Sequence, residues 1–202
     1  MQEPGSVPPS TQPSSANKEE IPLEYAYRLL NPGGVVLLSV GTMGGRDNLL
    51  PITWNMPVRK DPPGLALVCS REHFSYPLLA LSRQFGVNIF SAEHAPTLLA
   101  CGTVSGFDVG DKFERFQLER EAAVHISAPL VAQAIAHLEC TMVQEVSVGS
   151  SSLIVANVLR ATARSDVFSE GQWRFDRGLT LLHHLSSDRF CISDKAIVVA
   201  KR

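Results

Sequence analysis

Short apolar runs separated by turn residues make up the first half of the chain. Residues 35–40 form a compact, β-rich apolar run after the turn sequence at residues 31–34, and residues 65–70 form a second run. The glycine-rich stretch 41–48 indicates a hairpin loop. Residues 52–58 alternate in polarity, as in a half-buried strand. One face of that strand would carry Ile52, Trp54, Met56 and Val58.

In the next part of the chain the spacing of apolar residues becomes that of a helix, and further on it returns to that of a strand. Residues 75–84 and 95–102 have helical spacing, and we expect residues 129–139 to be helical at their start. The polar and aromatic residues 105–120 indicate a long loop or a short helix. Further strands are predicted at residues 85–90, 140–148 and 153–162, the last two joined by a Gly-Ser hairpin turn. The chain is therefore expected to be mainly β, a barrel or a sandwich with short α-helices outside.

The two ends of the chain differ in composition. Residues 1–20 are rich in Pro, Ser, Gln and Asn and poor in large apolar side chains, so we expect a disordered N-terminal tail. Residues 21–202 are enough for one well-buried core, and we expect a single domain there.

Charge and composition exclude several classes of function. A formal net charge of -2 gives no basic field for nucleic acid. No apolar run approaches the roughly 18 residues of a membrane span, and no secretory leader is evident, so a soluble cytoplasmic protein is expected. The four cysteines are widely spaced, which is typical of reduced, buried residues. The histidines have no metal-ligand spacing, so no metal is expected.

Three polar clusters are candidates for ligand binding. The first runs from Asn48 to Asn55 and includes Thr53 and Trp54. Donors at fixed positions on a strand suit a flat heteroaromatic ligand. An ordinary surface strand whose tryptophan packs inward is the alternative.

The second cluster lies where a predicted strand leads into a predicted helix. Ser70, Arg71 and Ser75 there combine an arginine with the N–H groups of a helix N-terminus, a combination that binds phosphate. The alternative is a helix cap beside a solvated arginine.

The third cluster is a polar loop. Ser105 and Gly106 offer a hydroxyl and a close backbone approach, and Lys112 offers a point charge for a phosphate. The alternative is a solvated loop anchored by Phe113.

In this order and spacing, the three clusters resemble the flavin reductase-like family, the FMN-binding split-barrel proteins that include flavoredoxins. The resemblance runs from about residue 32 to about residue 190 and includes Phe85-Gly86-Val87-Asn88. It implies a split β-barrel, a homodimer and FMN near the dimer interface. It implies that the isoalloxazine ring is lined by Thr53, Trp54 and Asn55. The phosphate is then held by Ser70, Arg71, Ser75 and Lys112, and the expected FMN-binding set is completed by Asn48, Asn88, Ser105 and Gly106.

Two positions depart from the family pattern. Phe107 stands where relatives commonly carry an arginine, and Asn157 stands where an acidic residue is common. Both leave the electron donor open. His184 is a candidate catalytic residue that would donate a hydrogen bond or a proton to the reduced ring. The alternative is that His183 and His184 lie at a surface or an interface.

The leading hypothesis for function is an NAD(P)H:flavin oxidoreductase-like enzyme. NADH or NADPH would be a transient donor, and a free flavin, a ferric chelate or a protein would be the acceptor. The alternative is a flavoredoxin-like carrier, or an FMN-binding protein without NAD(P)H turnover. A barrel scaffold that has lost flavin is a third hypothesis.

Overall fold

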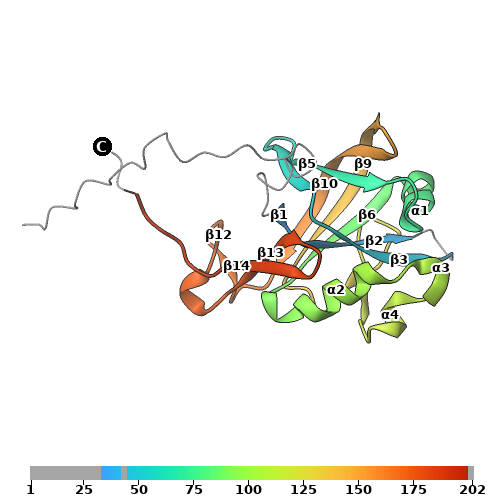
Figure 1. Ribbon diagram of the computed structural model, residues 1–202. Helices are drawn as coiled ribbons and strands as arrows, with labels where there is room; N and C mark the ends of the chain where they lie inside the picture. Colours follow the sequence, from blue (N-terminus) through green and yellow to red (C-terminus); the bar gives the residue numbers. More distant parts are fainter. Residues whose placement is uncertain (1–32, 42–44, 200–202) are drawn as a thin grey trace, which may run out of the picture.

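A computed structural model describes residues 33–41 and 45–199 of the chain, and it shows one strongly curved sheet with short helices packed outside (Figure 1). The predicted disordered tail, residues 1–20, and the predicted start of the domain at residue 21 lie outside the described residues. The prediction of a mainly β chain with short helices is confirmed.

Seven antiparallel strands form the main sheet, in the order β3-β2-β6-β9-β10-β5-β4. Their bounds are β2 Val36–Gly41, β3 Asp47–Ile52, β4 Asn55–Arg59, β5 Gly64–Ser70, β6 Gln84–Ile89, β9 Ala136–Val148 and β10 Ser151–Ala163.

The sheet rolls up because its two edge strands are consecutive in the chain. β3 and β4 lie at opposite ends of the strand order, yet only Thr53 and Trp54 separate them. Three Cα–Cα steps span at most about 11 Å, so the two edges must approach each other. The described ladders do not pair β3 with β4, which leaves the barrel split at this link.

Smaller elements surround the barrel. The helices are α1 Ser75–Ser82, α2 Ala95–Thr103, α3 Gly106–Val109 and α4 Lys112–Arg115, with 3-10 turns at Ala92–His94 and Phe175–Arg177. A three-stranded sheet contains β1 Gly33–Gly34, β13 Leu181–Ser186 and β14 Arg189–Ser193. The two short hairpins are β7 Arg120–Glu121 with β8 Leu130–Val131, and β11 Phe168–Ser169 with β12 Gln172–Trp173.

Apolar side chains fill both the barrel and the space outside β2. Val36, Leu38 and Val40 pack into the barrel core, whereas Val35 and Leu37 belong to a second cluster with residues of α2 and α4. The strand is therefore buried along its whole length, as its continuous apolar run suggested. This second cluster holds α2 and α4 against β3, beside the end of the barrel where the edges meet.

Two local predictions are wrong. The start of residues 129–139 is not helical, because it forms β8 and a turn before β9, and the backbone N–H of Val131 donates to the side chain of Asn88. The strand predicted at residues 52–58 breaks at Thr53 and Trp54, where the chain changes partners. Trp54 is 51% exposed instead of packing inward. Within residues 33–41 and 45–199, no helix combines the length and the apolar character that a bilayer span needs.

Candidate functional site

A polar recess of about 410 Å³ lies where β3, the start of α1, the end of α2 and α4 come together. Five of the expected FMN-binding residues line it, drawn from all three sequence clusters: Asn48, Ser75, Ser105, Gly106 and Lys112. The rest of its lining is Leu50, Glu72, His73, Phe74, Cys101, Gly102, Thr103 and Val104.

Asn48 brings an unsatisfied polar atom to the polar recess. Its side chain is 2% exposed, and its Nδ2 donates to the Oγ of Ser75 over 2.8 Å. Its Oδ1 is buried without a hydrogen-bond partner among the described residues. Such atoms are rare in folded proteins, because a buried polar group without a partner costs about 1–3 kcal/mol. The recess therefore calls for a ligand with a hydroxyl or N–H donor.

Lys112 is a buried cation in the same wall. Its Nζ donates to the backbone oxygens of Leu49, at 3.0 Å, and Cys101, at 2.7 Å. Burial lowers the pKa of Lys112, and the neighbouring Cys101 partly opposes that shift. An ammonium group has three donors, so one N–H remains for a ligand.

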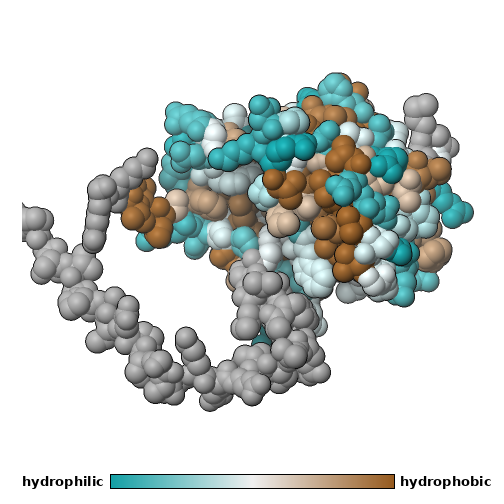
Figure 2. Space-filling model, turned by 90° about the horizontal axis from the view of Figure 1, so that it is seen from above, coloured by the Kyte–Doolittle hydropathy of each residue, from teal (hydrophilic) through white to brown (hydrophobic). Residues whose placement is uncertain are grey.

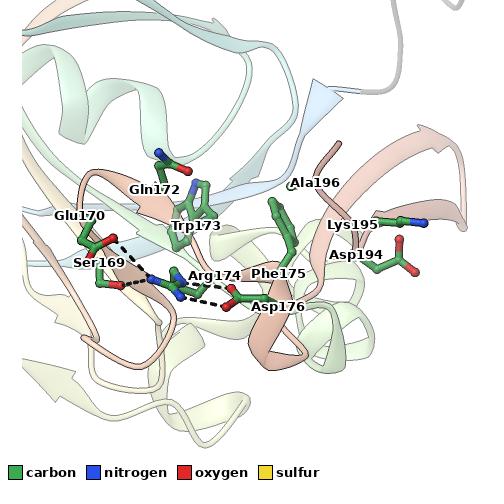
Figure 3. Close-up of a pocket in the computed structure, with 10 residues that line it drawn as sticks. All are labelled: Ser169, Glu170, Gln172, Trp173, Arg174, Phe175, Asp176, Asp194, Lys195 and Ala196. Atoms are coloured by element: carbon green, nitrogen blue, oxygen red, sulfur yellow. Dashed lines mark hydrogen bonds and ion pairs between the residues drawn. The ribbon is translucent and has the colours of Figure 1, made fainter. Parts of the chain in front are cut away.

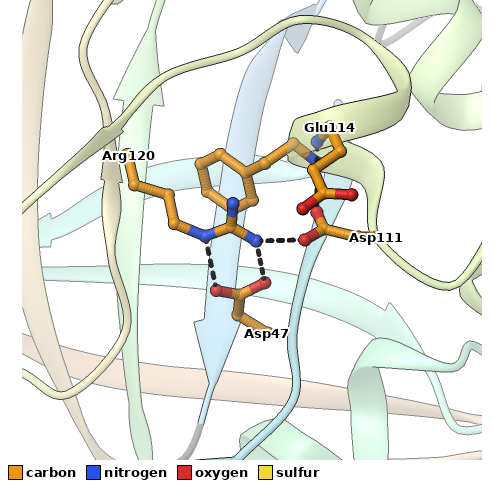
Figure 4. A network of polar contacts seen from close by, with 5 residues as sticks. Asp47, Asp111, Glu114 and Arg120 are labelled. Carbon is orange, nitrogen blue, oxygen red and sulfur yellow. Dashed lines mark hydrogen bonds and ion pairs between the residues drawn. The ribbon is translucent and has the colours of Figure 1, made fainter.

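Arg120 joins β3, which carries Asn48, to the start of α4, which carries Lys112 (Figure 4). The guanidinium of Arg120 donates to both carboxylate oxygens of Asp47, at 3.0 and 2.9 Å, and to Asp111 at 2.6 Å. The same group lies 4.3 Å from the ring centroid of Phe113. The two carboxylates raise the pKa of Arg120. We call this set of Asp47, Asp111 and Arg120 the Arg120 bridge.

Asp111 also caps the N-terminus of α4. Its Oδ1 accepts hydrogen bonds from the backbone N–H groups of Phe113, at 2.8 Å, and Glu114, at 3.2 Å. Burial raises the pKa of Asp111, but the hydrogen bonds from Arg120 and from these N–H groups outweigh it, so the pKa lies below its usual value. Because Lys112 follows directly, this cap sets where the ammonium group lies.

Gly106 allows an aromatic ring to close the recess. A Cβ at this position would overlap the ring of Phe74, which packs edge-to-face on Phe107 with 4.8 Å between centroids. Ser105 caps α3 by accepting from the N–H of Phe107 at 3.2 Å. Phe107 itself is 73% exposed.

A second hollow of about 470 Å³, the apolar recess, adjoins the first. It shares Gly102 and Thr103 with the polar recess and is bordered by Thr53 and His184. The Nε2 of His184 lies 2.9 Å from the backbone oxygen of Ser187, and its ring packs 5.2 Å from that of Phe190. The remaining lining is Val35, Pro51, Leu98, Leu99 and Asp188.

Ser70 and Arg71 line neither recess. The Nε of Arg71 donates to Ser152 Oγ at 3.0 Å, and the Oγ of Ser70 accepts from the N–H of Glu72 at 3.3 Å. The structure thus turns this arginine toward the start of β10, although its neighbours Glu72 and His73 line the polar recess.

Asn55 and Asn88 also lie outside both recesses. Asn55 Nδ2 donates to the backbone oxygen of Gly34 at 2.8 Å, which ties β1 to the barrel split. Asn88 is fully buried, and its Nδ2 donates to the oxygen of Leu37 at 2.9 Å while its Oδ1 accepts from Val131. Both amides bond to backbone groups of this chain.

Two lining residues were missed by sequence reasoning. His73 lies inside the second cluster, between Arg71 and Ser75, so its position in that cluster was the signal that could have identified it. Thr103, at the end of α2, joins the two recesses, and nothing in the local pattern marked it.

A third hollow of about 430 Å³ lies elsewhere, between the β11–β12 hairpin and residues 194–196 (Figure 3). In it Arg174 pairs with Asp176 and donates to Ser169 Oγ at 3.1 Å. It contains none of the residues expected to bind FMN. Among the described residues, no group of three or more His, Cys, Asp or Glu side chains is placed to hold a metal ion.

The fold and the two joined recesses define a split-barrel protein with a candidate site beside the split. Residues 27–189 match the family model of the flavin reductase like domain. The chain belongs to the flavin reductase-like family. A protein of Escherichia coli K12, YddH, whose function is uncharacterised, is 33% identical over 181 residues, which are 88% of this chain and 95% of YddH.

Solved structures share the fold. An FMN-binding domain of a flavin reductases-like enzyme from Shewanella baltica superposes with a TM-score of 0.74 at 24% identity, over 89% of this chain and 96% of that one. Flavoredoxin from Methanosarcina acetivorans superposes with a TM-score of 0.77 at 21% identity, over 92% and 96% of the two chains. The prediction of a split barrel is confirmed.

Proposed function

We propose that this chain binds FMN and acts as an oxidoreductase of the NAD(P)H:flavin reductase type. The phosphate end of FMN would lie in the polar recess and the ring in the apolar recess. The observation that carries the proposal is that these recesses share a wall at Gly102 and Thr103 and differ in chemistry, as the two ends of FMN do.

The donors of the polar recess suit a phosphate and a polyol. Lys112 supplies a positive charge, and the hydroxyls of Ser75 and Thr103 line the same wall. Among the described residues no side chain caps the start of α1. The N–H of Tyr76 already donates to the backbone oxygen of His73 and Pro77 has no N–H, so the N–H of Ser75 is the one in this first turn that could meet an anion. The orphan Oδ1 of Asn48 suits a ribityl hydroxyl.

The apolar recess suits a flat ring. FMN, when bound, supplies a ring system that accepts a hydride and passes on electrons. Thr53 would donate a hydrogen bond to the ring edge, and Trp54, at the barrel split, would shield the ring. His184 is oriented by its contact with Ser187, and we propose that it hydrogen-bonds or protonates the ring.

A flavoredoxin-like carrier is the second candidate. Phe107 lies exposed against Phe74, where an arginine of relatives would offer a cation to a nicotinamide nucleotide. An apolar rim at this point suits a protein partner or an uncharged acceptor better than a dinucleotide. Under this candidate, bound FMN exchanges electrons with a partner and NAD(P)H does not turn over.

The proposal includes a homodimer and a cytoplasmic setting. Three apolar side chains next to the barrel split are 44–57% exposed, namely Met56, Val58 and Leu159, and a second copy would cover them. All four cysteines are free, which agrees with a reducing compartment. Light scattering should give twice the chain mass, and a monomer at all concentrations would contradict the dimer.

The test is an anaerobic reduction of the FMN-loaded protein. Bleaching of the flavin band by NADH or NADPH, followed by recovery on addition of free flavin or a ferric chelate, would support the reductase and identify its donor. Bound flavin that dithionite bleaches and neither nucleotide does would support the carrier.

A further inference from the structure

His73 occupies the polar recess without a strong partner of its own. It lies in the connection between β5 and α1, two residues before Ser75. Its Nδ1 is 3.9 Å from the Sγ of Cys69, a long contact to a weak partner. No other described residue hydrogen-bonds to the ring, so its Nε2 is available to a ligand.

The titratable groups around His73 come from four parts of the chain. Lys112 on α4 and Cys101 on α2 line the same recess, Glu72 precedes it in the chain, and Cys69 is the β5 contact. Burial raises the pKa of both thiols to about 11, so both are uncharged near neutral pH. Among the described residues, the full charges that act on the imidazole are therefore the cation of Lys112 and the exposed anion of Glu72.

These surroundings disfavour a protonated His73 while the recess holds no anion. His73 is an exposed residue whose ring is only partly shielded from water. That partial burial lowers the pKa of His73 most, the charge of Lys112 lowers it further, and Glu72 opposes both. A phosphate between Lys112 and His73 would reverse the balance, because two negative charges would then face the imidazole.

We propose that His73 is a further ligand of the phosphate end of the bound molecule, and that it takes up one proton from solvent when that end binds. The inference rests on the proposed function and extends it. Binding would then be linked to pH, since the complex holds a proton that the free protein lacks. The recess would favour phosphate monoesters over the same molecule without phosphate, and more so as the pH falls from 8 to 6.

Calorimetry of FMN binding in buffers of different ionisation enthalpy tests this at pH 6 to 8, with riboflavin as the ligand that lacks phosphate. The wild-type protein should take up close to one proton per FMN near pH 7 and none per riboflavin. His73→Gln keeps a neutral donor and removes the titration. It should bind FMN about tenfold more weakly at pH 6 and within about twofold of wild type at pH 8. His125 is exposed, as His73 is, but lies outside the recess, so His125→Gln is the matched control and should behave as wild type.

Two results overturn the inference alone: FMN binds and His73→Gln takes up as many protons as wild type, or riboflavin takes up as many protons as FMN. If FMN fails to bind to the wild-type protein at any pH, the proposed function fails and the inference fails with it. The phosphate of free FMN also gains a proton near pH 6. That contribution of the free ligand is the same for wild type and His73→Gln, and riboflavin lacks it.

Discussion

Asn48 donates a hydrogen bond to the hydroxyl of Ser75 across 2.8 Å, and this bond joins the edge strand β3 to the first residue of α1. The two residues are 27 positions apart and both are almost fully buried. The amide of Asn48 has two polar atoms, and only its Nδ2 has a partner among the described residues. The bond therefore links β3 to α1 and leaves the Oδ1 of Asn48 without a hydrogen bond. A ligand in the recess would supply that hydrogen bond.

A substitution at Asn48 tests whether this residue also binds the ligand, in addition to linking β3 to α1. Asn48→Asp removes the amide donor to the Ser75 Oγ, although the Ser75 hydroxyl can donate to the new carboxylate, and it places a negative charge in the recess expected to hold the phosphate. We expect FMN affinity to fall by about 1–3 kcal/mol, and riboflavin affinity to fall much less. Fluorescence titration measures both. Asn157→Asp, on β10 and outside the polar recess, is the matched control, and an equal loss in that variant would refute the assignment.

Lys112 should contribute most of the preference for FMN over riboflavin. Lys112→Met keeps the length of the side chain and removes the charge, so FMN binding should weaken at least tenfold more than riboflavin binding. The backbone oxygens of Leu49 and Cys101 lose their donor, and the free energy of unfolding should fall by about 1–3 kcal/mol as well. Parallel losses for both ligands would mean that the effect comes from the fold alone.

The Arg120 bridge should stabilise the fold more than an ordinary surface ion pair does. Arg120→Gln should lower the free energy of unfolding by about 1–2 kcal/mol in urea denaturation at pH 7. Arg164→Gln breaks a pair in which both side chains are 57% exposed, and it should leave the stability almost unchanged. Equal effects of the two substitutions would show that the bridge is an ordinary surface pair.

The same bridge predicts an acid dependence. The pKa of Asp111 is depressed in the folded protein, so its contribution is fully present above the unfolded value of about 3.9 and is lost as the pH falls through the folded pKa. The stability difference between wild type and Arg120→Gln should hold from pH 7 to 5 and shrink below about pH 4. Urea melts at each pH measure it, and a difference that grows on acidification would contradict the sign.

The cysteines should differ sharply in reactivity. Burial raises the pKa of Cys69 and Cys101 to about 11 and that of Cys140 to about 12, which leaves few thiolates at pH 8. Cys191 is only half-buried. A thiol reagent should therefore modify one cysteine quickly and three only on unfolding, and Cys191→Ser should remove the fast phase. Two or more fast thiols in the native protein would contradict the burial.

The sequence predicted most of the strands because their periodicity reflects burial. The runs at residues 35–40, 65–70 and 85–90 became β2, β5 and β6 with small shifts at their ends. The alternation at residues 52–58 predicted one strand where the structure has two. The alternation of polar and apolar residues continues across Thr53 and Trp54, although the chain passes there from one edge of the sheet to the other and changes its partner strand. Exposure of Trp54 follows from that change of partners, which no local pattern records.

The sequence predicted which segments form the site better than it predicted the contacts of each side chain. Asn48, Ser75 and Lys112 do meet in one recess, as the order of the three clusters suggested. Asn88 and Arg71 also stand at matching positions, yet their side chains bond to groups of this chain. Which way a polar side chain turns depends on backbone acceptors brought close by folding, and those acceptors have no signature in the sequence.

The central claim is a flavin site whose polar end recognises phosphate, and an equilibrium titration of the purified protein with FMN and with riboflavin tests it most directly. The account predicts saturable quenching of flavin fluorescence at one FMN per chain, with riboflavin bound at least tenfold more weakly. Equal affinity for the two flavins would contradict the assignment of the polar recess, and no binding of either would contradict the proposed function itself.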